Sequence, residues 1–189
     1  MIEAIDRLFN HPGLRAAAVK LRIPVVLLAG AALIYHADPR WLWSGFAISM
    51  AGELIQLWSF ASLNKNVDLA AQGPYALVRN PMYLGRFFIL LGALALAGIG
   101  TLLVVYAIGY WFYMTNRVAR EERRLKAVLG APYEAYCEAV ARFVPGAPYR
   151  GNKVLFWDWR LFFQNNGHLN FVGTAVFWAV AIGWILARR

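Results

Sequence analysis

Apolar residues come in long runs separated by short polar stretches. Residues 23–35 (IPVVLLAGAALIY) and 41–61 are predominantly apolar, residues 87–115 contain no charge, and a last run covers 171–187. A helix needs about 20 apolar residues to cross a hydrocarbon core of about 30 Å, so the first run also requires part of residues 16–22. The pattern predicts an all-α integral membrane protein that forms one domain over residues 1–189.

The run at 87–115 is too long for one crossing. As a single helix it would extend about 43 Å at 1.5 Å per residue. It would also place Arg79 and Arg86 on the opposite side of the membrane from the basic stretch that begins at Arg117. A helical hairpin that turns near residues 98–101 brings both groups to one side. We therefore expect about five membrane helices, two of which form this hairpin.

The Lys and Arg residues predict the orientation. With a cytoplasmic N-terminus, 16 of the 19 cations fall on the inner side, and Arg40, Arg188 and Arg189 fall outside. This is the bias of the positive-inside rule, so we predict a cytoplasmic N-terminus, in the inner membrane if the source is bacterial. Residues 1–15 lack the apolar core of a cleavable signal peptide, and the first span is expected to stay.

Composition supports the same class. Charged residues make up 15% of the chain and hydrophobic residues 60%, whereas soluble domains carry about 25% charged residues. The net charge of +9 comes from cations that flank apolar runs, which indicates lipid headgroups rather than nucleic acid as partners. A single cysteine, Cys137, excludes an internal disulfide. The histidines His11, His36 and His168 lie in different segments, so no metal site is expected.

The first of two polar blocks, residues 73–86, precedes the hairpin. Pro81 forces Asn80 out of helical geometry and suits the first turn of a helix. Free backbone N–H groups at such a start bind carboxylate or phosphate, and Arg79 and Arg86 add positive charge nearby. Taken alone, however, this block is more typical of a capped helix start with interfacial cations.

The second block, residues 117–150, follows the hairpin on the same predicted side. Its residues 117–142 predict a charged helix, a Gly-Ala-Pro break and an amphipathic helix. Glu121 and Glu122 have cations within reach on the same helix, so ion pairing and a ligand role both stay open. Tyr133 and Tyr136 share a helix face, a spacing that more often serves packing.

Together the blocks GPYALVRNPMYLG and EERRLKAVLGAPYEAYCEAVARFVP resemble the isoprenylcysteine carboxyl methyltransferase family and the related membrane phospholipid methyltransferases. The matching positions are Gly73, Tyr75, Arg79, Pro81, Tyr83, Gly85, Glu121, Glu122, Leu125, Gly130, Tyr133, Tyr136, Arg142 and Pro145. Asn80 replaces the family's usual His, and Leu129 stands where Phe is common. The resemblance covers about residues 45–145, and residues 150–189 form an extension with a further span.

The resemblance implies S-adenosylmethionine as the cofactor, held on the cytoplasmic side between the two blocks. The implied cofactor-binding residues are Tyr75, Arg79, Asn80, Pro81, Met82, Tyr83, Gly85, Glu121, Glu122, Leu125, Tyr133 and Tyr136. The acceptor would be a lipophilic molecule or lipidated substrate that enters from the bilayer through an opening between helices.

The chemistry of methyl transfer suggests the catalytic candidates. The reaction is an in-line displacement that depends on positioning and desolvation. A carboxylate acceptor needs only a cation such as Arg142, whereas an amine acceptor must lose a proton, to Glu121 or Glu122 acting as base. Glu53, inside the second apolar run, is a further catalytic candidate on the acceptor path. A helix-packing face with polar contacts explains Glu53 equally well.

Two other functions compete with the methyltransferase. The segment YEAYC partly matches the final block of NADPH-dependent sterol-reductase-type membrane enzymes, but the chain lacks their Gly-Trp-x-x-x-Arg-His run. A non-catalytic membrane adaptor would keep the scaffold and lose the activity, with Asn80 as a trace of that loss. Residues 154–163 (VLFWDWRLFF), which mix aromatic and charged residues, are expected to form an interfacial segment.

Overall fold

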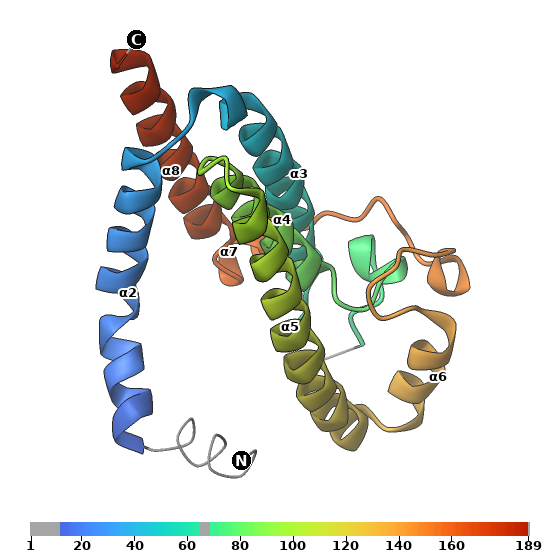
Figure 1. Cartoon of the computed structure of the whole chain (residues 1–189). Coiled ribbons are helices and arrows are strands. Elements are labelled where there is room, and N and C mark those ends of the chain that lie inside the picture. The colour runs from blue at the N-terminus through green and yellow to red at the C-terminus, as the bar shows by residue number, and fades with distance from the viewer. Residues whose placement is uncertain (1–11, 65–68, 189) are drawn as a thin grey trace.

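A computed structural model describes residues 12–64 and 69–188. All regular secondary structure within these ranges is helical. The elements are α2 (Pro12–Tyr35), η1 (Pro39–Trp41), α3 (Leu42–Phe60), η2 (Gly73–Ala76), α4 (Pro81–Ala95), α5 (Gly100–Leu129), α6 (Ala131–Ala139), η3 (Tyr149–Gly151), α7 (Trp159–Gln164) and α8 (Gly167–Ala187) (Figure 1). The all-α prediction is confirmed over these residues.

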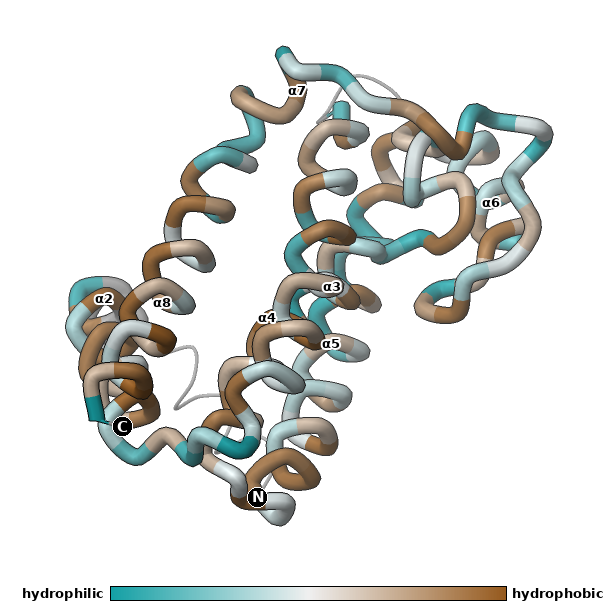
Figure 2. Tube along the Cα trace, turned by 90° about the horizontal axis from the view of Figure 1, so that it is seen from above, coloured by the Kyte–Doolittle hydropathy of each residue, from teal (hydrophilic) through white to brown (hydrophobic). Residues whose placement is uncertain are grey.

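The long helices form a bundle, with η1 at the end where α3 begins and α7 near the end where α3 stops. Helices α3, α4 and α5 pack side by side, and α8 packs against α3 and α2. Seen from above, α2 and α8 lie on one side of the α3–α4–α5 group and α6 lies on the other (Figure 2). The two faces of the bundle therefore carry different elements.

Small residues let α3 and α4 approach closely. A Cβ atom added to Gly52 on α3 would lie 2.6 Å from the carbonyl oxygen of Gly85 on α4. Ser49 on α3 donates a hydrogen bond of 3.1 Å to the carbonyl of Ile89 on α4. Because a side chain larger than hydrogen does not fit at Gly52, small residues at this crossing let the two backbones pack closely.

The predicted hairpin is confirmed, and so is the predicted break after it. Helix α4 ends at Ala95 and α5 begins at Gly100, with Gly98 at φ +66° in the turn. Helix α5 then continues for 30 residues, so the charged helix after Arg117 is its second half. Gly130, at φ +60°, ends α5 and lets α6 begin at once.

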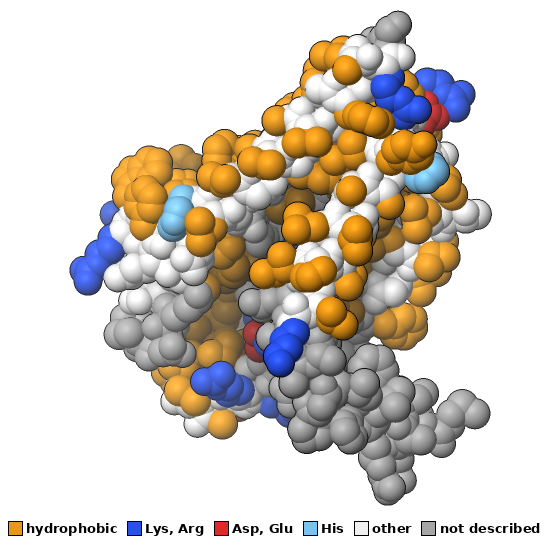
Figure 3. All heavy atoms as spheres, turned by 90° about the vertical axis from the view of Figure 1, so that its left-hand side faces the viewer, with side chains coloured by type: hydrophobic (Ala, Val, Ile, Leu, Met, Phe, Trp, Pro, Cys, Tyr) orange, Lys and Arg blue, Asp and Glu red, His pale blue; other side chains and the backbone are white. Residues whose placement is uncertain are grey.

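One helix of the described chain, Gly167–Ala187, is long and apolar enough by itself to span a membrane. Ile23–Tyr35 and Pro81–Ala95 are shorter apolar helices. Figure 3 shows hydrophobic side chains along the helices of one face, with Lys and Arg gathered toward their ends. Helices α2, α3, α4, α5 and α8 stand where the five membrane helices are predicted, and their crossing of a bilayer stays a prediction.

The C-terminal extension is bound to the end of α3. The side-chain amide of Asn165 donates to the carbonyls of Phe60 and Leu63, at 2.9 and 2.7 Å. The indole of Trp58 donates to the carbonyl of Phe156 at 3.1 Å. Residues 154–163 include most of α7, and these hydrogen bonds attach the extension to the same bundle as the family-like core.

Candidate functional site

A cavity of about 580 Å³ lies where the two polar blocks meet. Its walls come from the start of α4, the second half of α5, the buried face of α6 and the chain on both sides of residues 65–68. This volume falls within the range of about 300–1,000 Å³ found for small-molecule sites. The hairpin thus brings together two blocks that are separated by about 30 residues of apolar helix.

Most of the predicted cofactor residues line this cavity. The lining set includes Tyr75, Arg79, Asn80, Met82, Tyr83, Glu121, Glu122, Leu125, Tyr133 and Tyr136. Pro81 and Gly85 lie outside it. Pro81 is buried at the first turn of α4, and a Cβ on Gly85 would lie 2.8 Å from the side-chain oxygen of Gln56 on α3. Their position indicates that they shape and seat α4 rather than touch the contents of the cavity.

The turn before α4 is held by the chain that follows α6. Asn80 has φ −128° and ψ 55°, outside helical geometry as Pro81 requires. The backbone N–H of Arg79 donates to the carbonyl of Ala141 at 3.0 Å, and the Asn80 amide donates to the carbonyl of Arg142 at 3.2 Å. Asn80, in place of the family's His, keeps the turn and joins it to the second block.

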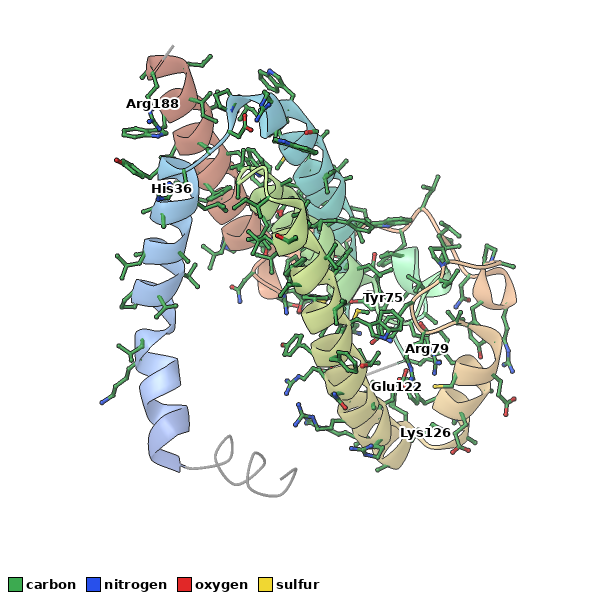
Figure 4. The ribbon with its side chains drawn as sticks, in the orientation of Figure 1. His36, Tyr75, Arg79, Glu122, Lys126 and Arg188 are labelled. Atoms are coloured by element: carbon green, nitrogen blue, oxygen red, sulfur yellow. The ribbon has the colours of Figure 1, made fainter. Side chains whose placement is uncertain are left out.

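Glu122 on α5 is the electrostatic centre of the site. Its carboxylate is 6% exposed and accepts hydrogen bonds from Arg142, at 2.6 Å from Nη2 and 3.2 Å from Nε. Arg79 Nη1 lies 3.3 Å from the same carboxylate, and Figure 4 shows Arg79 and Glu122 close together between α5 and α6. The hydrogen bond with Glu122 raises the pKa of the Arg142 guanidinium. One carboxylate therefore joins three segments of the chain.

Four tyrosines complete the polar wall. Tyr136 donates 2.6 Å to the carbonyl of Tyr75, and Tyr83 donates 2.9 Å to the carboxylate of Glu121. Burial raises the pKa of Tyr75, Tyr133 and Tyr136. These phenols therefore keep their protons at neutral pH, and Tyr136 uses its proton in the hydrogen bond to Tyr75.

One N–H donor of the Arg79 guanidinium makes no hydrogen bond to the described residues. Its Nε is buried and has no hydrogen-bond partner among the described residues. Arginine N–H groups bind carboxylate or phosphate most strongly, because both partners carry charge. The Nε has almost no accessible surface, so an anionic group in the cavity would meet the 12% of the Arg79 side chain that is exposed.

Sequence analysis missed several lining residues. Tyr113, Arg117 and Arg124 lie on the α5 face that carries Glu121, and Arg86 lies on α4. The sequence suggested Arg86 as charge beside the helix start and Arg117 and Arg124 as ion-pair partners of the glutamates, but not as walls of one cavity. These lining residues of α5 lie on one face of the helix, because they are spaced three or four apart, at 113, 117, 121, 124 and 128. This helical spacing is the sequence signal that identifies the face.

Two predicted catalytic residues lie outside the cavity lining. Arg142 contacts Glu122 rather than the cavity itself. Glu53, on α3, contacts Asn170 and Thr174 of α8. Glu53 therefore does not line the cavity that the predicted cofactor residues share. Its predicted role on the acceptor path stays a prediction.

Comparison with known proteins agrees with the predicted family. Residues 44–127 match the isoprenylcysteine carboxyl methyltransferase (ICMT) family. The chain is 30% identical over 102 residues to Protein-S-isoprenylcysteine O-methyltransferase of Schizosaccharomyces pombe, which covers 54% of this chain. The aligned segment spans 43% of that relative, less than half of its length. No solved structure matches the chain. Residues 44–127, which contain the first block, the hairpin and both glutamates of α5, are therefore similar to the isoprenylcysteine carboxyl methyltransferase family.

Proposed function

We propose that this protein is an S-adenosylmethionine-dependent methyltransferase that acts on a lipophilic acceptor, an isoprenylcysteine-type carboxylate or a lipid. The observation that carries the proposal is the cavity of about 580 Å³, whose walls come from both family motifs. Each motif taken alone has a simpler explanation, as a helix start or an ion-paired helix. A cavity lined by both motifs is what the binding of one cofactor between them requires.

The lining residues fit the cofactor. S-adenosylmethionine, when bound, supplies an electrophilic methyl group on a sulfonium. Arg79 would hold its carboxylate, because the Arg79 side chain lines the cavity and guanidinium–carboxylate hydrogen bonds are charge-assisted. The carboxylate of Glu121 would receive an ammonium or hydroxyl group, and Met82 and Leu125 supply apolar surface for the adenine. The cavity thus offers an acceptor, a donor and an apolar wall to a ligand that needs all three.

A carboxylate acceptor needs a cation rather than a base. Arg142 is engaged by Glu122, whereas Arg86 and Arg117 line the cavity from the two helices of the hairpin. We therefore assign the acceptor carboxylate to Arg86 and Arg117, with Arg142 holding Glu122 in place. An amine acceptor would have to lose a proton first, and Glu121 lines the cavity in a position to take it.

The proposed topology places this cavity at the cytoplasmic membrane face. In it α2, α3, α4, α5 and α8 cross the bilayer and the N-terminus is cytoplasmic, in the inner membrane if the source is bacterial. The side chains of α2 support the proposal, since Val25, Val26, Leu27 and Leu28 are each more than half exposed. Apolar surface of this extent on one helix suits contact with lipid.

Calorimetric titration in non-ionic detergent tests the proposal, with S-adenosylmethionine and NADPH added separately. We expect S-adenosylmethionine to bind and NADPH not to bind. Binding of NADPH alone would support a membrane reductase. Binding of neither ligand would support a non-catalytic membrane adaptor. Glu122→Gln should weaken cofactor binding, and Glu138→Gln, at an exposed position of α6, is the matched control. A methylation assay with labelled cofactor on prenylcysteine and on total membrane lipids then identifies the acceptor class.

A further inference from the structure

Residues 153–163, the α7 segment, present large apolar side chains at the surface of the described structure. Leu155 is 94% exposed and Trp159 64% exposed, and Trp157 and Phe163 are also exposed. The rings of Trp157 and Trp159 lie 5.1 Å apart, and the rings of Trp159 and Phe163 lie 6.4 Å apart. Contiguous exposed apolar surface marks contact with a partner or a membrane. The segment lies outside residues 44–127, so the family match does not account for this surface.

The backbone of the α7 segment is bound to the helical bundle at two points. The indole of Trp58, near the end of α3, and the hydroxyl of Ser62, just after it, donate to the carbonyl of Phe156 at 3.1 and 3.2 Å. The N–H of Gly73, the first residue of η2, donates to the carbonyl of Lys153 at 2.8 Å. These contacts fix the segment beside α3 and join it to the first polar block, which lines the candidate cofactor cavity. The exposure of its aromatic side chains is therefore a property of the fold.

The α7 segment also carries positive charge without a partner in the described chain. Lys153 and Arg160 are exposed, and neither forms an ion pair with a described residue. The one acidic residue of the segment, Asp158, accepts hydrogen bonds from the backbone N–H groups of Arg160 and Leu161, at 2.7 and 3.3 Å, and so caps α7. Tryptophan lies at headgroup level in membranes, and Lys and Arg attract anionic lipids. A membrane surface with anionic headgroups therefore satisfies the apolar side chains and both cations together.

The segment lies where the proposed topology places the cytoplasmic surface of the bilayer. Helix α8 begins at Gly167, four residues after Phe163, and is the described helix that is long and apolar enough to span a membrane by itself. Figure 2 shows α7 at the outer edge of the bundle, where α8 begins. Leu169, in the first turn of α8, is also exposed and extends the apolar surface toward the span. The exposed side chains thus lie at the end of a predicted span and at the edge of the bundle.

We propose that the α7 segment docks on the cytoplasmic surface of the membrane and binds anionic phospholipid headgroups. Leu155, Trp157 and Trp159 enter the interface, and Lys153 and Arg160 bind the headgroups. Through its hydrogen bond to η2, the docked segment holds the candidate cofactor cavity at the membrane surface. The proposal rests on the proposed crossing of the bilayer by α8, and it does not depend on methyl transfer or on S-adenosylmethionine.

The depth of Leu155 in a bilayer tests the docking. The full chain with Cys137→Ala and Leu155→Cys is labelled with an environment-sensitive fluorophore and placed in phosphatidylglycerol nanodiscs. Val176→Cys, at an exposed position in the middle of α8, is the reference for the bilayer interior, and Glu138→Cys, on α6, is the reference for water. We expect aqueous iodide to quench the label at position 155 less than the label at 138. Lipids spin-labelled close to the headgroup should quench it more than the label at 176.

The two reference positions separate failure of the proposal from failure of the topology. If iodide reaches position 155 as readily as 138 while 176 is shielded, α8 crosses the bilayer but the α7 segment does not dock, and its surface is left for a protein partner. If iodide reaches both 155 and 176, the crossing by α8 is wrong as well. Either result overturns the proposal, and neither concerns cofactor binding, which calorimetry measures separately.

A second experiment tests the role of charge with the unlabelled chain in non-ionic detergent, so it does not require the cysteine variants to fold. Dihexanoyl-phosphatidylglycerol and dihexanoyl-phosphatidylcholine are titrated separately, and binding is followed by tryptophan fluorescence and thermal unfolding. We expect phosphatidylglycerol to bind at least about fivefold more tightly, which corresponds to about 1 kcal/mol, the contribution of one Lys or Arg near an anionic surface.

Two double variants with the same change in charge make this experiment decisive. Lys153→Gln with Arg160→Gln should reduce the preference for phosphatidylglycerol below about twofold. Arg123→Gln with Lys126→Gln removes the same charge from exposed positions of α5 outside the cavity lining, near the end of that helix (Figure 4), and should leave the preference unchanged. Equal binding of the two lipids to the wild type, or the same loss of preference in both double variants, would overturn the proposal.

Discussion

Glu53 and Glu122, the two buried glutamates of the described chain, have opposite surroundings. Glu122 and Glu53 are 6% and 2% exposed, so burial does not distinguish them. Glu122 lies between the guanidinium groups of Arg79 and Arg142, which come from segments before and after its own helix. Glu53 accepts hydrogen bonds from an amide and a hydroxyl on α8.

This difference separates a carboxylate that closes an ion-pair network from one that receives neutral donors of a neighbouring helix. The cations of Glu122 come from the turn before α4 and the chain after α6, so its charge holds the walls of the cofactor cavity together. The neutral partners of Glu53 orient its carboxylate without balancing the charge. A buried glutamate can thus close an ionic network or bind a neighbouring helix through neutral donors, and its tertiary partners decide between the two.

The largest effect is expected from Glu122→Ala. The change leaves Arg79, whose side chain is 12% exposed, without its carboxylate. Breaking a buried pair costs about 3–5 kcal/mol, and we expect about 2–3 here because the Arg142 side chain is 43% exposed and partly screened. Thermal unfolding in detergent should show the loss, and calorimetry should show S-adenosylmethionine binding weakened more than tenfold.

The control for this variant is Glu138→Ala, an exposed glutamate on α6. It removes one negative charge from the same region without touching the network. Wild-type cofactor binding by Glu122→Ala would place the cofactor elsewhere in the protein.

Local sequence signals account for the parts of the fold that were predicted. Pro81 at the first turn of α4 and the positive φ of Gly130 act on their immediate neighbours, and the helix boundaries there follow from them. The hairpin follows from the length of an uncharged run and the charges at its two ends. These features need no knowledge of distant contacts.

The partners of Glu122 could not be predicted in the same way. Cations on the same helix are within reach of both Glu121 and Glu122, and Glu121 does lie 3.8 Å from Arg117. Glu122 instead pairs with Arg79 and Arg142, 43 and 20 residues away. Only the packing of α6 against the turn before α4 selects these partners. The motif likewise did not reveal that Gly85 faces α3 rather than the cavity.

The next effect in size is expected from Glu53→Leu. It leaves the amide of Asn170 and the hydroxyl of Thr174 without their acceptor, which costs about 1–3 kcal/mol. The double variant Glu53→Leu with Asn170→Leu should recover part of this loss, since replacing both partners by apolar groups is nearly neutral. Thermal unfolding of the three proteins measures the difference. Unlike Glu122→Ala, the Glu53 variant should leave the affinity for S-adenosylmethionine within about twofold of the wild type. A larger loss would show that Glu53 supports the cofactor cavity.

Tyr83→Phe should have a smaller effect, confined to the cofactor cavity. It removes the 2.9 Å hydrogen bond to Glu121, whose side chain is 45% exposed. The expected cost is about 0.5–1.5 kcal/mol, which corresponds to a Kd about 2–12 times higher for S-adenosylmethionine. Tyr106→Phe is the matched control, because Tyr106 donates to the carbonyl of Phe87 and lies outside the cavity lining. Equal losses in both variants would trace the effect to helix packing instead.

The smallest effect is expected at Asn80, where this chain departs from the family pattern. The Asn80 amide donates a 3.2 Å hydrogen bond to the carbonyl of Arg142, the residue whose side chain holds Glu122. Asn80→Ala removes that bond and should cost about 0.5–1 kcal/mol in cofactor binding. Asn80→His restores the family residue and keeps a donor, so its Kd should stay within about twofold of the wild type. Methylation rates of the two variants complete the comparison. If Asn80→His raises the rate more than tenfold while the Kd is unchanged, the imidazole performs a chemical step, and the role of Asn80 as a tether of the Arg79–Glu122–Arg142 network is wrong.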